Sequence, residues 1–217
     1  MSRPVSIQDD VILEAARKVF LKRGFRAPTV EIARKAGVSE GTLFKRFPTK
    51  PELFMAAMNV ETNDQVWQEQ LMRSVGTGDM KEALEAAAVS MIQQVQIILP
   101  RVMMIHSSGV TVAMDYYLPN KPPVLQHLEL LTRYFRAEMK RGRLACASPE
   151  LQAHAFIGSL YHYVICDFFH RYRPVPAREY VRGVVATLLR ATRPERQQNA
   201  KQPRAKIAPR RTKGPKK

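Results

Sequence analysis

The sequence predicts an all-α protein. Between residues 51 and 190, apolar side chains recur three and four positions apart, the spacing of one helix face, and no sustained alternation typical of strands appears. Glycine and proline separate the apolar stretches at Gly76, Pro100, residues 119–123 and residues 174–176, where helices are expected to end. A hydrophobic content of 45% in 217 residues is sufficient for a buried core.

The first 50 residues begin with two predicted helices. The first runs from Ile12 to Gly24. Thr29 can cap the second helix, with apolar residues on one face. This helix ends at Ala36, because Gly37 readily takes the left-handed conformation that terminates a helix.

A turn of three residues leads to a third predicted helix, from Glu40 to Arg46. Ser39 can cap this helix by accepting a hydrogen bond from a backbone amide of the first turn, while Leu43 faces inward. Thr49 and Glu52 have the spacing of a capping box for the helix that follows. Two short helices around a tight turn are the arrangement of a helix-turn-helix.

The outward face of the third helix carries the residues expected to meet DNA. These residues are Glu40, Gly41, Thr42, Lys45 and Arg46. A helix that enters the major groove offers such side chains to base edges, and a glycine lets the backbone approach closely. Lys50, at the positive end of the next helix, suits a phosphate. The segment therefore favours nucleic-acid binding over a helical hairpin that only packs.

Residues 7–60 resemble the TetR/AcrR family of transcriptional regulators. The resemblance rests on the upstream helix and on the motifs Thr29-Val30-Glu31-Ile32-Ala33, Gly37-Val38-Ser39, Gly41-Thr42-Leu43-Phe44, Phe47 and Lys50. It implies base or groove contacts at Glu40, Gly41, Thr42, Phe44 and Lys45, and phosphate contacts at Thr29, Arg46 and Lys50. It also implies an N-terminal helix-turn-helix domain of three helices followed by a larger helical domain for ligand binding and dimerisation.

Two positions depart from the family pattern. Phe44 stands where the family usually has Tyr, so a hydrogen bond to phosphate is lost while the ring can still touch a thymine methyl. Arg46 stands where His is common. We hypothesise that its guanidinium restores the lost phosphate contact, since it offers several donors in a rigid fork.

The remainder of the chain predicts six more helices. Their expected ranges are residues 51–73, 79–99, 101–108, 124–141, 149–172 and 177–190. The last two are the most apolar, and in a TetR-like protein they would pair with their copies in a second subunit. The residues expected at that interface are Phe156, Leu160, Val164, Phe168, Val181, Val184 and Leu188, with Gly158 and Ser159 permitting close approach. Burial within one subunit is the alternative.

A small-molecule effector is expected between these last helices and the DNA-binding domain, because the resemblance implies one there. Soft and aromatic side chains suited to an apolar pocket occur in this region. Our candidates are Trp67, Met103, His106, Tyr117 and Phe135. Ordinary core packing is the competing interpretation for each of them.

A metal site is a second possibility that the sequence raises. His162, Cys166 and His170 recur every fourth residue on one helix face, and such side chains bind zinc or copper. One helix face closes a tetrahedral site poorly, however, and packing is the alternative. We therefore expect neither a metal nor a cofactor. Nucleophile elbows, phosphate-binding loops and dinucleotide motifs are also missing, so we expect no enzyme.

The formal net charge of +16 is unevenly distributed. Counting Lys and Arg against Asp and Glu gives +5 for residues 1–60, +1 for residues 61–189 and +10 for residues 190–217. The proline-rich basic tail is expected to be disordered, either as an arm on DNA phosphates or as a solvated tail. We expect a DNA-binding domain at residues 1–50, an effector and dimerisation domain at residues 51–190, and the tail at residues 191–217.

These observations predict a regulator of transcription whose partner is double-stranded DNA. We expect a cytoplasmic homodimer that binds a pseudo-palindromic operator, acts as a repressor and is released by a small molecule. The chain lacks a signal stretch or an apolar run of about 18 residues, so we expect no membrane partner. The alternative is an architectural DNA-binding protein with little sequence preference that relies on its basic tail.

Overall fold

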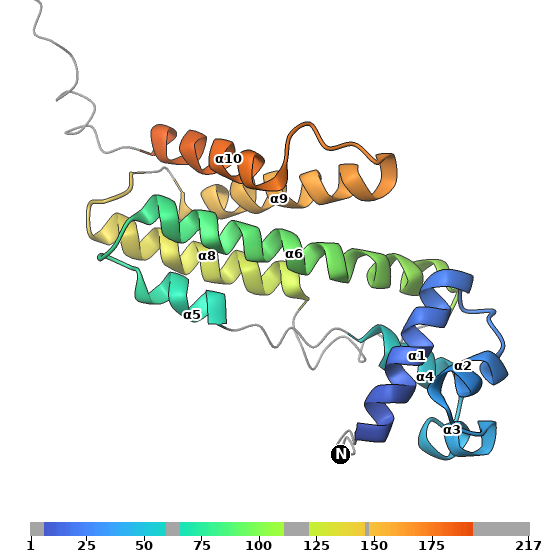
Figure 1. Ribbon diagram of the computed structural model, residues 1–217. Coiled ribbons are helices and arrows are strands. Elements are labelled where there is room, and N and C mark those ends of the chain that lie inside the picture. The colour runs from blue at the N-terminus through green and yellow to red at the C-terminus, as the bar shows by residue number, and fades with distance from the viewer. Residues whose placement is uncertain (1–6, 60–65, 111–121, 146–147, 193–217) are drawn as a thin grey trace, which may run out of the picture.

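The structure is a computed structural model that describes residues 7–59, 66–110, 122–145 and 148–192. These residues contain helices and no strand, so the predicted all-α fold is confirmed. The helices form a small N-terminal domain at one end of a longer helical bundle (Figure 1). The basic tail lies almost entirely outside the described residues.

The N-terminal domain packs four helices around one core. They are α1 (Ile7–Arg23), α2 (Thr29–Ala36), α3 (Glu40–Arg46) and α4 (Lys50–Met58). Phe20 and Phe54 meet edge to face with ring centroids 5.1 Å apart, and Phe25 packs on Phe54 at 5.0 Å. Although we expected α4 in the second domain, Leu53, Phe54 and Met58 of α4 are buried in this first core.

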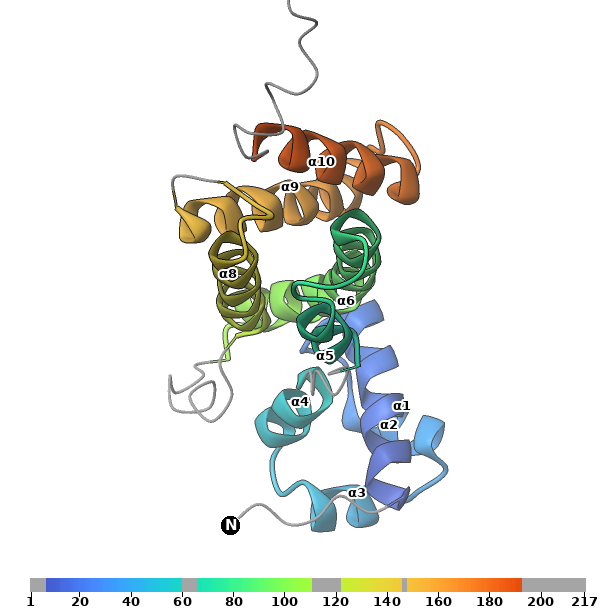
Figure 2. The ribbon, with the colours of Figure 1, turned by 90° about the vertical axis from the view of Figure 1, so that its left-hand side faces the viewer.

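The second domain is a bundle of five described helices. They are α5 (Val66–Arg73), α6 (Met80–Ser107), α8 (Pro123–Lys140), α9 (Pro149–His170) and α10 (Ala177–Ala191). Helices α9 and α10 lie on one side of α6 and α8, and α5 lies on the opposite side (Figure 2). Large side chains from all five helices form one core, including Trp67, Phe135, Phe156 and Leu188.

The two helices predicted on either side of Pro100 are one continuous helix, α6. The expected break was wrong because a proline inside a helix removes only one backbone donor and crowds one carbonyl group. Packing at both ends offsets that cost: Met91 and Val95 are buried in the second core, whereas Ile105 is buried in the first. Helix α6 therefore connects the two domains.

Helix α6 is also long and apolar enough to span a membrane by length and composition, with a mean hydropathy of 1.4. The core helix of a globular bundle meets the same test. Helices α5, α9 and α10 contact α6 in the bundle, and α1 and α4 contact it in the N-terminal domain. These contacts bury part of its apolar surface.

The helix predicted over residues 51–73 ends at Met58 in the structure. Asn59 follows with an extended backbone and donates its N–H to the carbonyl oxygen of Met55 at 2.9 Å. Arg17 of α1 and Arg101 of α6 donate to the carbonyl oxygens of Ala57 and Asn59, at 3.0 and 3.2 Å. Cations suit the negative end of a helix, so the two arginines favour termination here.

Candidate nucleic-acid interface

The turn between α2 and α3 has the geometry that the sequence predicts. Gly37 takes the left-handed conformation, with φ of 70°, and the Val38 N–H donates to the carbonyl oxygen of Ala33 at 3.0 Å. The Ser39 hydroxyl accepts from the Thr42 N–H at 3.1 Å and caps α3. The predicted helix-turn-helix is therefore held by a left-handed glycine and a serine cap.

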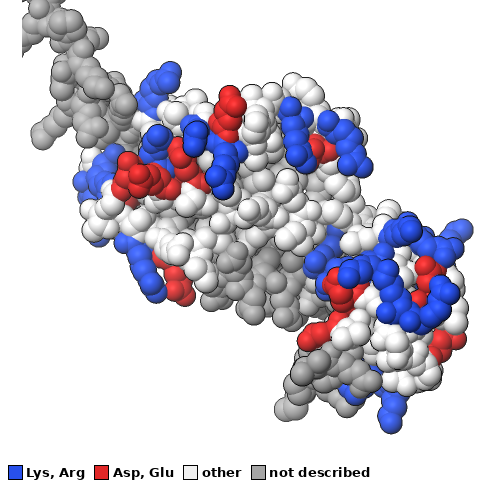
Figure 3. Space-filling view, viewed as in Figure 1, with Lys and Arg blue, Asp and Glu red and all other residues white. Residues whose placement is uncertain are grey.

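Helix α3 buries one residue completely and exposes a face. Leu43 has no exposed surface and anchors the helix in the first core. Glu40, Gly41, Phe44 and Lys45 are exposed, and Thr42 is half-buried beside the cap. Figure 3 shows Lys and Arg side chains spread over the N-terminal domain with fewer acidic side chains among them.

Gly41 is not required by the fold of the free protein. Within the part of the chain that the structure describes, a Cβ atom built on Gly41 would meet nothing closer than the Ser39 hydroxyl at 3.7 Å, an ordinary van der Waals contact. A glycine costs an exposed helix roughly 1 kcal/mol relative to alanine. Its presence on this face is consistent with a close approach by another molecule.

Thr29 does not cap α2 as predicted. The extended residue before the helix is Pro28, and no side-chain cap bond is formed, so Thr29 is already helical. Its hydroxyl instead donates to the Glu40 carboxylate at 2.7 Å. The two candidate contact residues are therefore tied to each other across the turn.

Arg46 and Lys50 have partners within the protein. The Arg46 guanidinium donates to Asp9 of α1 at 3.0 Å, and this ion pair is largely buried. The Lys50 ammonium lies 5.1 Å from the centre of the Phe25 ring, while Thr49 caps α4 by accepting from the Glu52 N–H at 3.2 Å. Sequence reasoning missed Asp9, whose place at the start of a helix gave no indication of a partner 37 positions away.

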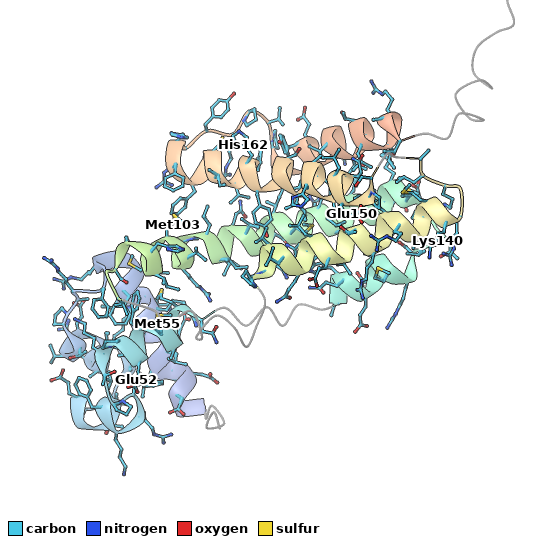
Figure 4. The ribbon with its side chains drawn as sticks, turned by 180° about the vertical axis from the view of Figure 1, so that it is seen from behind. Glu52, Met55, Met103, Lys140, Glu150 and His162 are labelled. Carbon is cyan, nitrogen blue, oxygen red and sulfur yellow. The ribbon has the colours of Figure 1, made fainter. Side chains whose placement is uncertain are left out.

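The five residues proposed for the effector pocket do not lie together in one described site. Trp67 and Phe135 are buried in the core of the second domain. Met103 and His106 lie near the end of α6, beside the N-terminal domain, where Figure 4 labels Met103. Tyr117 lies outside the described residues.

A buried polar cluster that sequence reasoning missed lies beside Trp67. His127 of α8 is 1% exposed, and its two ring nitrogens lie 3.1 Å from the Tyr161 hydroxyl and 3.1 Å from the Gln94 amide oxygen. The His127 ring meets the Trp67 ring edge to face at 5.3 Å. The sequence pattern could have predicted the burial of His127, because this residue shares its helix face with Leu130 and other buried residues of α8.

Burial keeps this cluster uncharged. Desolvation lowers the pKa of His127 to about 4, so the imidazole is neutral at physiological pH. Burial also raises the pKa of Tyr161, whose hydroxyl keeps its proton.

The seven residues expected at a dimer interface separate into two groups. Phe156, Leu160, Val164, Val181 and Leu188 are buried within the single subunit. Phe168 is partly exposed, and Val184 lines a groove of about 760 Å³ between α9 and α10.

The surface that α9 exposes includes Phe168 and Gly158, which were expected at the interface, and further residues that were not expected there. Positions three and four apart form a stripe along the helix, and all of them are exposed. They are Leu151, Ala155, Gly158, His162, Ile165 and Phe169. On α10, Gly183 and Ala186 are exposed as well. Helical periodicity correctly identified the apolar face of α9. That face is buried within the subunit because it packs against α6 and α8.

The suggested His and Cys cluster is partly assembled. The Cys166 sulfur lies 3.3 Å from Nε2 of His162, and His170 is exposed at the end of α9. The described residues contain no group of three or more potential ligands placed to hold a metal ion.

Two family models match the chain. The model described as bacterial regulatory proteins, tetR family, matches residues 12–57, and that of the AefR-like transcriptional repressor C-terminal domain matches residues 78–192. The second match alone spans more than half of the chain. Together the two models cover most of both described domains.

Individual proteins show the same relationship. The regulator QacR of Staphylococcus aureus is 40% identical over 62 residues, which are 28% of this chain and 32% of that protein. YvkB of Bacillus subtilis, named an uncharacterized HTH-type transcriptional regulator, is 43% identical over 54 residues, 24% of this chain and 29% of that protein. The chain thus aligns with about a third of the length of these relatives.

A solved structure extends the likeness to the whole fold. A TetR-family regulator from Mesorhizobium loti superposes with a TM-score of 0.68, at 20% identity over 88% of this chain and 99% of that one. With the helix-turn-helix geometry and the two family matches, these findings establish that the chain belongs to the TetR family of bacterial transcriptional regulators.

Proposed function

We propose that this TetR-family regulator binds a pseudo-palindromic operator as a homodimer, represses the promoter there and is released by a small molecule. The observation that carries the proposal is the exposed face of α3, which presents Glu40, Gly41, Phe44 and Lys45 beyond a well-capped turn. A helix of this kind reads base edges in the major groove. As a DNA-binding regulator, it would act in the cytoplasm.

The exposed stripe of α9 supports a homodimer. Leu151 and Phe169 are each more than half exposed, and an apolar surface of this kind on a soluble domain marks an interface. Gly158 in the middle of the stripe would let a second copy approach closely. A dimer would place two α3 helices on successive major grooves, which recur about every 34 to 36 Å.

Release by an effector follows from a difference in affinity. A small molecule that binds one conformation of the dimer more tightly shifts the population toward it. If that conformation spaces the α3 helices wrongly, a coupling of about 1 to 3 kcal/mol weakens DNA binding roughly 5- to 150-fold. Helix α6 is suited to transmit such a change, because it packs in both cores.

The experiment that tests this function is selection of random duplex DNA by the full-length protein. A salt concentration of about 150 mM weakens sequence-independent binding to phosphates. We expect enrichment of a palindrome whose half-sites are about one helical turn apart. Binding without enrichment would contradict the proposal and support the architectural alternative.

Two lysines then separate base reading from phosphate contact. Lys45→Ala should weaken binding unevenly, by about 1 to 3 kcal/mol at particular base pairs of the selected site. Lys50→Ala should weaken binding to every sequence alike and reduce the salt dependence by about one phosphate contact. Affinity measurements on the selected site and on single-base variants of it distinguish the two. An equal loss on every sequence for Lys45→Ala would remove Lys45 from the base-reading residues.

A further inference from the structure

Trp67 of α5 lies between a surface groove and the buried polar cluster of the second domain. Its side chain is 5% exposed, and its ring packs edge to face on His127. Trp67 also lines a groove of about 310 Å³ between α5 and α6, together with Gln70, Leu71, Ser74, Ala83, Ala87 and other residues. A cavity of roughly 300 Å³ is at the lower end of the range for small-molecule sites.

Two buried donors of this cluster have no hydrogen-bond acceptor among the residues that the structure describes. They are Nε1 of Trp67 and Nε2 of Gln94. The other polar atoms of the cluster are satisfied, since His127 contacts both Tyr161 and the Gln94 oxygen. An indole N–H can only donate, whichever way the Gln94 amide is oriented. Buried donors without an acceptor are costly, so a ligand oxygen would bind favourably here.

The charges around Trp67 restrict the kind of ligand. His127 is neutral and the Tyr161 hydroxyl is protonated, so the buried cluster offers no counter-charge. Among the residues that the structure describes, the groove is lined by Asp79 and Glu82 and by no Lys or Arg. An anion would therefore meet carboxylates, and a cation would leave the two donors without an acceptor.

We propose that the effector of this regulator is an uncharged, largely apolar small molecule with a carbonyl or similar oxygen, and that this oxygen accepts a hydrogen bond from Trp67. The apolar side chains that line the groove, which include Leu71, Ala83 and Ala87, provide the apolar surface. The inference rests on the proposed ligand-responsive function.

Three probes that share a cyclohexyl ring test the chemical class. They are cyclohexyl methyl ketone, cyclohexanecarboxylate and cyclohexyltrimethylammonium, each titrated into the full-length protein. Trp67 is the only tryptophan of the chain, so its fluorescence reports directly on the site. We expect saturable binding of the ketone with a change in tryptophan emission, and affinities at least about tenfold weaker for both ions. Tighter binding of either ion, or no saturable binding of the ketone, would overturn the proposal.

Variants test the hydrogen bond itself. Trp67→Phe keeps an aromatic ring and removes the N–H, and we expect the ketone to bind about tenfold more weakly by calorimetry. Gln94→Leu should also weaken binding. Gln93→Leu, at an exposed position of α6 outside the groove, is the matched control for Gln94→Leu and should bind the ketone as the unchanged protein does.

Unchanged ketone affinity in Trp67→Phe, with a normal thermal unfolding curve, would refute recognition by the indole. The comparison of ketone with ions in the unchanged protein does not depend on any variant folding. None of these titrations contains DNA. A failure of the proposed operator binding would appear separately, as a DNA selection without enrichment.

Discussion

At the residue scale, the position of α3 depends on side chains that attach it to the domain. Its exposed face contains one residue without a side chain. Leu43 and the Arg46–Asp9 ion pair attach α3 to the domain, and the Ser39 cap orients its first turn. Gly41 lies on the opposite, exposed face. Glycine at this position makes α3 less stable than a larger residue would, although the free protein has room for a side chain there.

Replacement of Gly41 by alanine should separate folding from DNA binding. We expect Gly41→Ala to stabilise the free protein by up to about 1 kcal/mol, because alanine favours the helix and its Cβ meets only an ordinary contact. Affinity for the selected operator should fall. Urea unfolding and DNA titration on the same preparation give both values. Unchanged DNA affinity would show that the backbone does not approach the groove at this position.

His127 predicts a pH dependence of stability. Its pKa is about 4 in the folded protein, against an ordinary value of 6.5, so the unfolded chain binds the extra proton. Stability should therefore decrease as the pH falls from 6.5 toward 4, by a total of about 3 kcal/mol from this residue. Above pH 6.5 the residue should contribute no slope.

The test compares unfolding free energies of the unchanged protein and His127→Gln between pH 7.5 and 4.5. Glutamine can form hydrogen bonds but does not titrate, so the two curves should converge as the pH falls. Gln93→Ala, at an exposed position of α6, removes no titratable group and serves as the control that should leave the slope unchanged. Parallel curves for His127→Gln would contradict the assignment.

At the element scale, α6 is the helix on which both domains depend. It contributes Met91 and Val95 to one core and Ile105 to the other, and its Arg101 binds the carbonyl end of α4. Pro100 lies between the residues of α6 that are buried in the second core and the residue that is buried in the first. The helix continues through the proline because the side chains on either side of it are held by separate cores.

Removal of Pro100 should stabilise α6. A proline costs a helix interior about 3 kcal/mol, and its rigidity in the unfolded chain offsets about 0.4 to 1 kcal/mol of this cost. We therefore expect Pro100→Ala to raise the free energy of unfolding by about 2 kcal/mol, measured by urea denaturation. A lower stability would instead show that the local shape of α6 at Pro100 is needed to reach both cores.

At the scale of the whole molecule, α9 and α10 carry the apolar surface on which we propose that a second copy of the chain binds. The exposed stripe along α9 continues beside the groove that these two helices line. A second copy of the chain on this face would cover apolar surface and link two DNA-binding domains. A substitution that prevents dimerisation through this face should therefore also abolish operator binding.

A charge in the stripe should dissociate the dimer without unfolding the subunit. Gly158 is exposed, and a Cβ built there meets no atom of the described residues within 4 Å, so Gly158→Glu is compatible with the fold of one subunit. We expect sedimentation to show a dimer for the unchanged protein and a monomer for the variant, with retained helical content. Arg133→Glu, on the exposed face of α8, should stay dimeric. A dimeric Gly158→Glu would place the interface elsewhere.

The sequence by itself determined the all-α class, the helix-turn-helix, and the caps at Ser39 and Thr49. These features depend on local physics: apolar spacing along one helix, a glycine at the left-handed position and hydroxyl caps within three residues of their partners. The same periodicity predicted the exposed positions Glu40, Gly41 and Lys45 of α3, whereas Arg46, also expected on the outward face, is paired with Asp9. Such features can be predicted because the interacting atoms are close together in the chain.

Only the tertiary structure decided how the helices pair. It joined α6 through Pro100, paired Arg46 with Asp9, turned Phe156 and Leu160 inward and placed Trp67 against His127. Each of these outcomes depends on contacts between residues far apart in sequence. Periodicity shows that a helix has an apolar face, but the arrangement of its neighbours decides what that face packs against.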